Sequence, residues 1–163
     1  MAAGRRLDLD QPAGAAGRYI FVMQSIGEAF AQDHRRLEQA LEASAAHVDA
    51  ARWEAAAEAF ADFRRGIERH MEVEEAVLFP AVEEGAETPL TAILRKGHHD
   101  LRVFFDELDD ALTARDADEY ARIAASMRAL LERHDEKEEA ELYPAAQARL
   151  GSQAAAVAAR LGN

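Results

Sequence analysis

Apolar residues recur at intervals of three and four along most of this chain, a spacing typical of helices that bury one face. Capping and helix-breaking residues divide the pattern into four segments. We expect a first helix at about 18–47 and a second from an N-cap at Asp49 to a stop near Gly85. A third helix is expected to start at Thr88 and Pro89, and a fourth to be capped by Asp116 or Asp118. Long helices joined by short connections favour an all-α fold, an antiparallel up-down four-helix bundle.

The chain has enough residues for one such bundle. Its 163 residues, 49% of them hydrophobic, can form one continuous core. Residues 1–17 contain Pro12 and several glycines and are expected to form a disordered arm. The bundle is expected over 18–150, and residues 151–163 are expected to form a short C-terminal helix or a tail.

A repeat with an offset of 64 residues relates the two halves of the chain. Residues 70–81 match residues 134–145 at eight of twelve positions. The same offset places His34 on His98 and pairs the apolar positions around them. We therefore expect two related helical hairpins that face each other across a pseudo-twofold axis.

Polar residues occupy positions on the apolar stripes, where a buried face is expected. These candidate metal ligands are His34, His70, Glu74, His98, His134 and Glu138. A His and a Glu four residues apart on a helix point the same way, so each repeat offers a nitrogen and a carboxylate to one place. Buried carboxylates require positive charge nearby, and two divalent ions would supply it.

The chemistry of the candidate ligands favours iron. The chain has no cysteine, so a site must use nitrogen and oxygen donors. Such a donor set favours iron or manganese in a paired, six-coordinate site over tetrahedral zinc, and iron is our first choice. If each Glu bridges, every ion has two His nitrogens and two carboxylate oxygens, and about two of six positions remain. A bridging oxo or hydroxo group can take one of them, and dioxygen, nitric oxide or peroxide the other.

The charge of the chain narrows the range of partners. A formal net charge of −12 repels phosphate backbones and anionic lipid surfaces, which disfavours a nucleic-acid or membrane partner. The region around 7–17 is polar and glycine-rich where a signal peptide would be apolar, so we expect a cytoplasmic location. No particular protein partner is predicted.

The motifs resemble the hemerythrin-like (HHE cation-binding) family. They are His34 followed by Leu37, two copies of H-x-x-x-E-E-x-x-L-[FY]-P, and His98-x-x-Leu101-Arg102, and the resemblance covers about residues 20–148. It implies a four-helix bundle with a non-haem di-iron centre that serves in oxygen binding, transport or sensing, or in responses to nitric oxide and peroxide.

One departure from the family pattern bears on function. Oxygen-carrying hemerythrins have a further His one turn after the third-helix ligand, where this chain has Arg102. The set of four His and two Glu is instead similar to that of bacterial repair-of-iron-centres proteins. The alternatives to ligand binding or sensing are therefore iron–sulfur cluster repair, peroxide disproportionation, and a metal-storage or interaction module.

Several neighbours of the candidate ligands have more than one interpretation. His99 is an alternative to His98, although the repeat favours His98. Glu75 and Glu139 are either partners of the histidines or solvated. Tyr143 contributes a hydroxyl only if it turns inward, and Arg102 is either a nearby cation or an exposed residue. Pro80 and Pro144 are expected to kink or end their helices, since proline clashes with a carbonyl one turn earlier.

Overall fold

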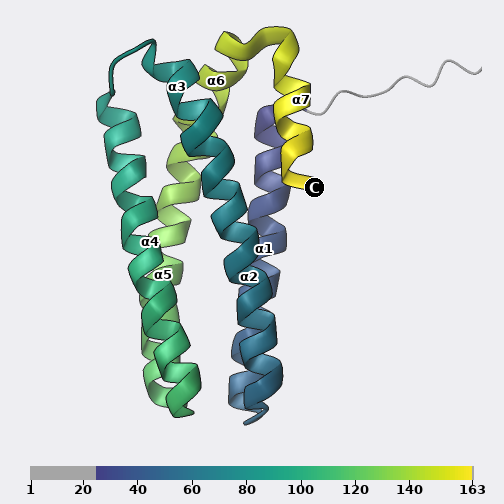
Figure 1. Cartoon of the computed structure of the whole chain (residues 1–163), viewed down its shortest axis with the longest axis vertical. Coiled ribbons are helices and arrows are strands. Elements are labelled where there is room, and N and C mark those ends of the chain that lie inside the picture. Colours follow the sequence, from purple (N-terminus) through teal and green to yellow (C-terminus); the bar gives the residue numbers. More distant parts are fainter. Residues whose placement is uncertain (1–24, 163) are drawn as a thin grey trace, which may run out of the picture.

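The described part of the chain is helical apart from short connections. The structure is a computed structural model, and it describes residues 25–162. Its four long helices are α1 (Ile26–Asp49), α2 (Trp53–Val73), α4 (Pro89–Ala114) and α5 (Ala117–Lys137). Shorter helices are α3 (Phe79–Glu83), α6 (Tyr143–Leu150) and α7 (Ala154–Ala158) (Figure 1). The predicted all-α fold is confirmed, whereas the expected arm at 1–17 lies outside the described residues.

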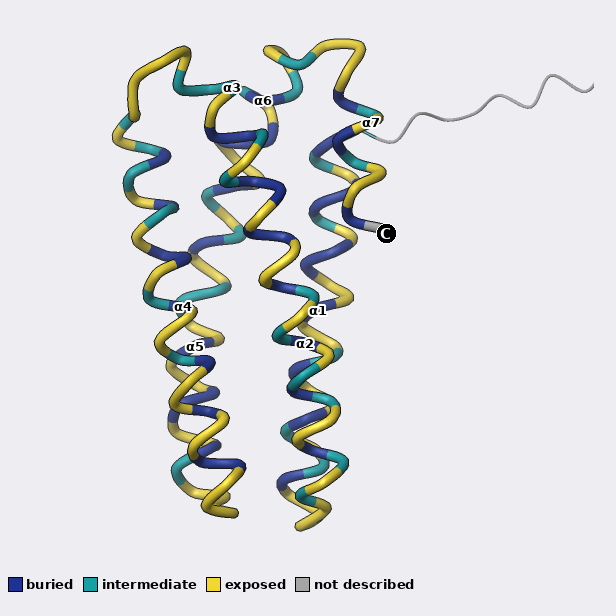
Figure 2. The backbone as a smooth tube through the Cα atoms, in the orientation of Figure 1, coloured by how far each residue is buried: buried dark blue, intermediate teal, exposed yellow. Residues whose placement is uncertain are grey.

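The long helices pack around a common interior. Helix α1 lies along α2 and also contacts α5, while α4 lies along α5 and also contacts α2 (Figure 1). Buried positions follow the inward side of each helix (Figure 2). Helix α7 packs against α1 near the end of the chain. These contacts make a four-helix bundle.

The interior of the bundle contains two apolar clusters. One includes Leu37, Phe63 and Leu101, and the other includes Phe30 and Leu94, together with residues of α3, α6 and α7. Along α1, His34 lies between Phe30 of one cluster and Leu37 of the other, and along α4 His98 lies between Leu94 and Leu101. The candidate ligands therefore form a polar layer between two apolar clusters.

Two helix starts differ from the sequence prediction. Ser25 is extended, its side chain accepts a hydrogen bond from the Glu28 amide, and its own amide donates to the Glu28 carboxylate. This capping box begins α1 at Ile26, so a helix continuous from position 18 is wrong. Asp49 is the last residue of α1 and not the N-cap of α2, which follows Arg52.

The other two predicted starts are confirmed. Thr88 accepts a hydrogen bond from the Thr91 amide, and Pro89 is the first residue of α4. Asp116 accepts from the Glu119 amide and so caps α5. Proline suits the first helical turn because the amide there has no partner within the helix.

A π-helical segment precedes each proline that was expected to kink or end its helix. Segments η1 (Glu74–Leu78) and η2 (Glu138–Leu142) join α2 to α3 and α5 to α6. Pro80 and Pro144 follow within the first two residues of α3 and α6. The wider turn accommodates the missing proline amide, so the chain continues in helical form beyond each segment. Both segments begin at a candidate ligand.

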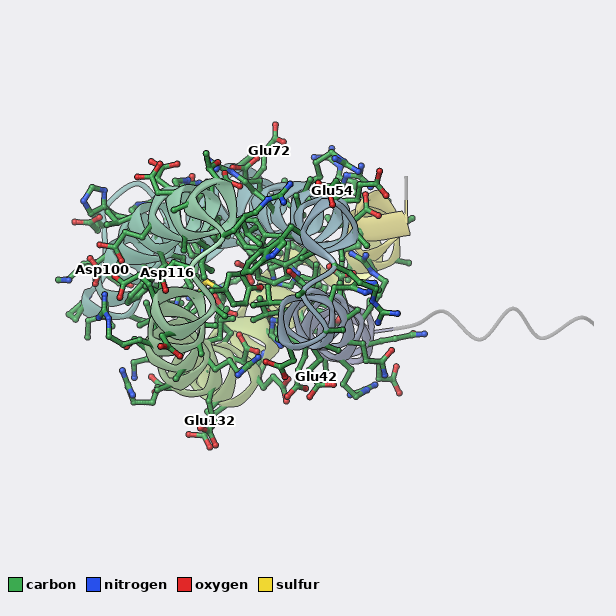
Figure 3. The ribbon with its side chains drawn as sticks, turned by 90° about the horizontal axis from the view of Figure 1, so that it is seen from below. Glu42, Glu54, Glu72, Asp100, Asp116 and Glu132 are labelled. Atoms are coloured by element: carbon green, nitrogen blue, oxygen red, sulfur yellow. The ribbon has the colours of Figure 1, made fainter. Side chains whose placement is uncertain are left out.

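Acidic side chains project from the outside of the bundle. Viewed along the bundle, Glu72 and Glu132 point away from the helices (Figure 3). Within residues 25–162, no helix combines the length and hydropathy that a bilayer-spanning segment requires.

A buried hydrogen-bond relay links three long helices, and we expect its loss to destabilise the bundle. The Tyr120 hydroxyl of α5 donates to Ser44 Oγ of α1 at 2.8 Å, and Ser44 donates to the Ala56 carbonyl of α2 at 3.0 Å. Ser44→Ala leaves the buried Tyr120 hydroxyl unpaired and should lower the free energy of unfolding by about 1–3 kcal/mol. Tyr120→Phe leaves Ser44 bound to Ala56 and should cost about 0.5–1.5 kcal/mol.

Urea denaturation of both variants measures these costs. Ser126→Ala is the matched control, because Ser126 also bonds to a helix carbonyl but is exposed. A Ser44→Ala variant as stable as the Ser126→Ala control would contradict the relay.

Candidate metal centre

All six predicted ligands meet in the interior of the bundle. His34 comes from α1, His70 from the end of α2, and His98 and His134 from α4 and α5. Glu74 and Glu138 are the first residues of η1 and η2. The six side chains form two groups, each with donor atoms within 4.8 Å of one another: Glu74, His98, His134 and Glu138, and His34, His70 and Glu138.

The two carboxylates lie between two histidine pairs. Glu74 Oε1 is 3.3 Å from His70 Nε2, and its Oε2 is 3.3 Å from His98 Nε2. Glu138 Oε2 is 3.4 Å from His34 Nε2, and its Oε1 is 2.7 Å from His134 Nε2. Each carboxylate thus directs one oxygen to each pair, which is the disposition of a bridging ligand.

The unpaired atoms of the site fit bound metal. Four of its buried atoms have no hydrogen-bond partner among the described residues: Glu74 Oε2, His98 Nε2, His134 Nε2 and Glu138 Oε1. The 2.7 Å contact between Glu138 and His134 is close enough for an ion pair but lacks hydrogen-bond geometry. A buried polar atom without a partner costs about 1–3 kcal/mol. Cations between these atoms would remove that cost, so the donor set is suited to hold them.

Carboxylates behind the histidines fix which ring nitrogen faces the interior. Nδ1 of His98 is 2.7 Å from Glu75 Oε1, and Nδ1 of His34 is 3.1 Å from Glu139 Oε1. A carboxylate oxygen only accepts, so each Nδ1–H donates and each Nε2 is left to bind a metal. Of the two interpretations of Glu75 and Glu139, the structure supports partners of the histidines.

Asp33 plays the same part for His70 and was missed by sequence reasoning. Its Oδ2 is 3.0 Å from His70 Nδ1, and Arg36 donates to its other oxygen at 2.8 Å. The repeat gave no signal for Asp33, because the equivalent position is Gly97. The signal present in the sequence was an acidic residue directly before His34, and the structure shows that this residue is buried.

Close packing against His134 explains why position 97 is a glycine. A Cβ at this position would lie 2.5 Å from Nδ1 of His134, closer than side chains approach. The absence of a side chain at Gly97 lets the His134 ring pack directly against α4. The His70 and His134 rings therefore have different surroundings, an acid in one case and bare backbone in the other.

Tyr143 turns inward. Its ring is buried, and its hydroxyl donates to Glu74 Oε1 at 2.8 Å and lies 3.1 Å from Glu138 Oε2. It also lies 3.0 Å from His34 Nε2 and 3.4 Å from His70 Nε2. The hydroxyl thus belongs to the site, which the sequence left open.

His99 and Arg102 lie outside the cluster of donors. His99 is exposed while its neighbour His98 is fully buried. Arg102 is exposed and donates to Glu75 Oε1 with two nitrogens, each at 3.1 Å. Arg102 therefore acts on His98 through the carboxylate between them.

In the metal-free site, protons on the histidines balance the buried carboxylates. Burial opposes the charge of His70, but Glu74 and the hydrogen bond to Asp33 outweigh it and raise its pKa to about 10. Burial likewise opposes the charge of His98, yet the nearby carboxylates of Glu138, Glu74 and Glu75 raise its pKa to about 10. Burial also opposes ionisation of Glu138, but the neighbouring His134, His34 and His98 hold its pKa well below its usual value.

The pKa of the Tyr143 hydroxyl is also raised, which in this case favours the neutral form. Burial, with the nearby charges of Glu74 and Glu138, raises its pKa well above the usual value of 10. Tyr143 is therefore a neutral hydrogen-bond donor in the metal-free site.

The family comparison agrees with this geometry. A family model for the hemerythrin HHE cation binding domain matches residues 25–146, about three quarters of the chain. The chain belongs to the hemerythrin HHE cation-binding family. No match was found among the curated proteins or among the solved structures. Membership of this family, together with the buried His and Glu groups, is compatible with a metal site at the centre of the bundle.

The close packing at Gly97 predicts a specific loss of metal in this hemerythrin-family bundle. Gly97→Ala should push the His134 ring away from Glu138 and lower the metal bound per chain by about half, because one histidine pair is disturbed. Elemental analysis of the purified variant measures the loss, and circular dichroism checks that it is folded.

Gly27→Ala is the matched control for this substitution. Its Cβ would meet its nearest neighbour, Tyr143 Cβ, at an ordinary 4.0 Å, so metal content should be unchanged. A Gly97→Ala variant that binds as much metal as the Gly27→Ala control would overturn the packing argument.

The raised histidine pKa values predict an alkaline loss of stability in the metal-free protein. His70 and His98 hold their protons up to a pH of about 10 when folded, against an ordinary value of 6.5. Between these limits the folded state binds more protons than the unfolded state, so the free energy of unfolding should fall as pH rises.

Urea unfolding at several pH values across this window tests the prediction. The metal-loaded protein is the control, because bound cations keep the imidazoles neutral and should flatten the profile. A metal-free protein whose stability does not change from pH 6.5 to about 10 would contradict the charge balance described above.

Proposed function

We propose that this chain is a non-haem di-iron protein that binds or senses a small molecule such as dioxygen, nitric oxide or peroxide. The observation that carries the proposal is the position of Glu74 and Glu138, each with one oxygen directed to each histidine pair. Family membership supports a cation at this place.

Each residue of the site has a definite part in this proposal. His34 and His70 would hold one ion, His98 and His134 the other, and Glu74 and Glu138 would bridge them. When bound, the ions supply redox chemistry and open coordination positions for a small ligand. The carboxylates of Asp33, Glu75 and Glu139 orient the rings.

The number of donors leaves room for such a ligand. Two nitrogens and two carboxylate oxygens per ion fill about four of six positions. A bridging oxo or hydroxo group would take one more, and a site with an open position favours reactivity over a purely structural role. Iron is our first choice, because nitrogen and carboxylate donors without sulfur suit it in a paired, six-coordinate site.

A surface groove brings the outside of the protein close to the site. It has a volume of about 440 Å³, and His34 forms part of its lining together with apolar residues such as Leu37 and charged residues such as Arg128 and Asp135. A small molecule can approach the histidine through this groove. The charge of −12 also supports a small neutral partner over nucleic acid or an anionic membrane.

The proposal includes an antiparallel arrangement of two related hairpins, α1 with α2 and α4 with α5. The offset of 64 residues between His34 and His98, and between His70 and His134, supports it. So do the extensive packing within each pair and the short links at the ends of the helices (Figure 1). Duplication of one hairpin would explain why each half contributes two His and one Glu.

Metal analysis of the native protein, joined to its absorption spectrum with and without dioxygen, tests the function. About two irons per chain and a near-ultraviolet oxo-bridge absorption are expected, and the spectrum should change on exposure to the ligand. The double variant His70→Ala, His134→Ala should lose most of the iron, because each histidine pair is reduced to one nitrogen.

His99→Ala is the matched control, since this histidine adjoins His98 but is exposed. Protein without metal, or a double variant with the same iron content as His99→Ala, would refute a di-iron site. Oxygen evolution from added peroxide would instead assign the enzymatic alternative.

A further inference from the structure

A second difference between the two halves of the repeat lies beside the site. Phe79 in the first half corresponds to Tyr143 in the second. The Phe79 ring stacks on His98, with centroids 5.4 Å apart and planes at 22°. Tyr143 instead directs its hydroxyl at the donor atoms of the His34 and His70 group. At this position the two halves of the site therefore differ by one oxygen atom, in addition to the difference between Asp33 and Gly97.

The π-helical segment explains why this oxygen reaches the site. Tyr143 follows Glu138 by five residues, and its amide donates to the Glu138 carbonyl. In a π turn, residues five apart lie above one another, whereas in an α-helix they point in different directions. The Tyr143 and Glu138 side chains consequently point to the same place, and their oxygens are 3.1 Å apart.

The Tyr143 oxygen lies close to four donor atoms of the site. The Tyr143 oxygen lies 2.8, 3.0, 3.1 and 3.4 Å from Glu74 Oε1, His34 Nε2, Glu138 Oε2 and His70 Nε2. Among those four atoms, the His34 to His70 distance is 3.1 Å, His70 to Glu74 is 3.3 Å, and His34 to Glu138 is 3.4 Å. The oxygen therefore lies within 3.4 Å of two histidine nitrogens and two carboxylate oxygens.

These spacings are those of neighbouring ligands around one six-coordinate ion. With metal–donor bonds of about 2.1 Å, adjacent vertices of an octahedron are about 3 Å apart. We propose that Tyr143 is a fifth protein ligand, as phenolate, of the metal ion held by His34 and His70. This inference rests on the proposed di-iron function and makes the two ions unequal, with five protein donors at one and four at the other.

Ligation by Tyr143 requires only the loss of one proton. In the metal-free site its hydroxyl donates to Glu74. When the ion binds, the O–H bond breaks, the proton passes to solvent, and one metal–oxygen bond forms, with no change in oxidation state. A bound cation reverses the local charge that otherwise keeps the hydroxyl protonated. Glu74 Oε1, which accepts the hydrogen bond in the metal-free site, would then serve as a metal ligand.

The visible spectrum of the iron(III)-loaded full chain tests the ligation. A phenolate bound to iron(III) should give a visible charge-transfer band, and excitation in that band should enhance phenolate vibrations in the Raman spectrum. Tyr143→Phe should abolish both. Tyr19→Phe and Tyr120→Phe are the controls, because they remove the other tyrosines of the chain and should leave the band unchanged.

The exchange of the two aromatic residues sharpens the test. The double variant Phe79→Tyr, Tyr143→Phe keeps the composition but moves the hydroxyl to the other half of the repeat. It should lose the original band or shift it, since a new phenolate would have His98 and His134 as its neighbours.

The possible outcomes separate the two proposals. Iron-loaded wild-type protein with two irons per chain but no phenolate band or vibrations would overturn ligation by Tyr143 and leave the di-iron function standing. Protein that binds no iron would refute the di-iron function itself. If Tyr143→Phe fails to fold, the wild-type Raman spectrum and the Tyr19→Phe and Tyr120→Phe controls still decide, because a band that survives in both controls must come from Tyr143.

Discussion

The compensation of two buried carboxylates is the constraint on which this structure depends. Glu74 is 0% exposed and Glu138 is 1% exposed, and both lie between apolar clusters. An uncompensated charge in such a place would cost several kcal/mol. In the metal-free protein, protonated His70 and His98 supply the balance. Two cations would do so more completely, because they also engage the donor atoms that have no partner.

The repeat and the apolar periodicity were sufficient to predict most of this arrangement. They placed the six ligand candidates on the inner side of the bundle because a stripe of apolar residues fixes which way its polar members face. The helix caps at Thr88 and Asp116 could also be predicted from the sequence, since each residue has a side chain that accepts a backbone hydrogen bond. Ser25 was missed because apolar residues precede it, although its capping box with Glu28 was present in the sequence.

The parts that could not be predicted depend on backbone detail or on symmetry that is broken. Pro80 and Pro144 indicated an irregularity, but not a π-helical segment that brings residues five apart onto one face. The orientation of Tyr143 follows from that segment, so periodicity of 3.6 residues gave no guide to it. Asp33 and Gly97 escaped notice because comparison of the two halves highlights identity, and here the halves differ.

Two of the differences between the halves fall at positions that touch the candidate ligands, whereas the candidate ligands themselves are matched. Asp33 supports His70 where Gly97 admits the ring of His134, and Tyr143 supplies an oxygen where Phe79 stacks on His98. A purely structural pair of ions would need no such inequality. A pair that binds an external molecule gains from it, because one ion held by more donors leaves the other as the preferred place for exchange. Under the proposed di-iron function, the matched His and Glu set would hold the two ions, and the unmatched residues around it would make the two ions differ in reactivity.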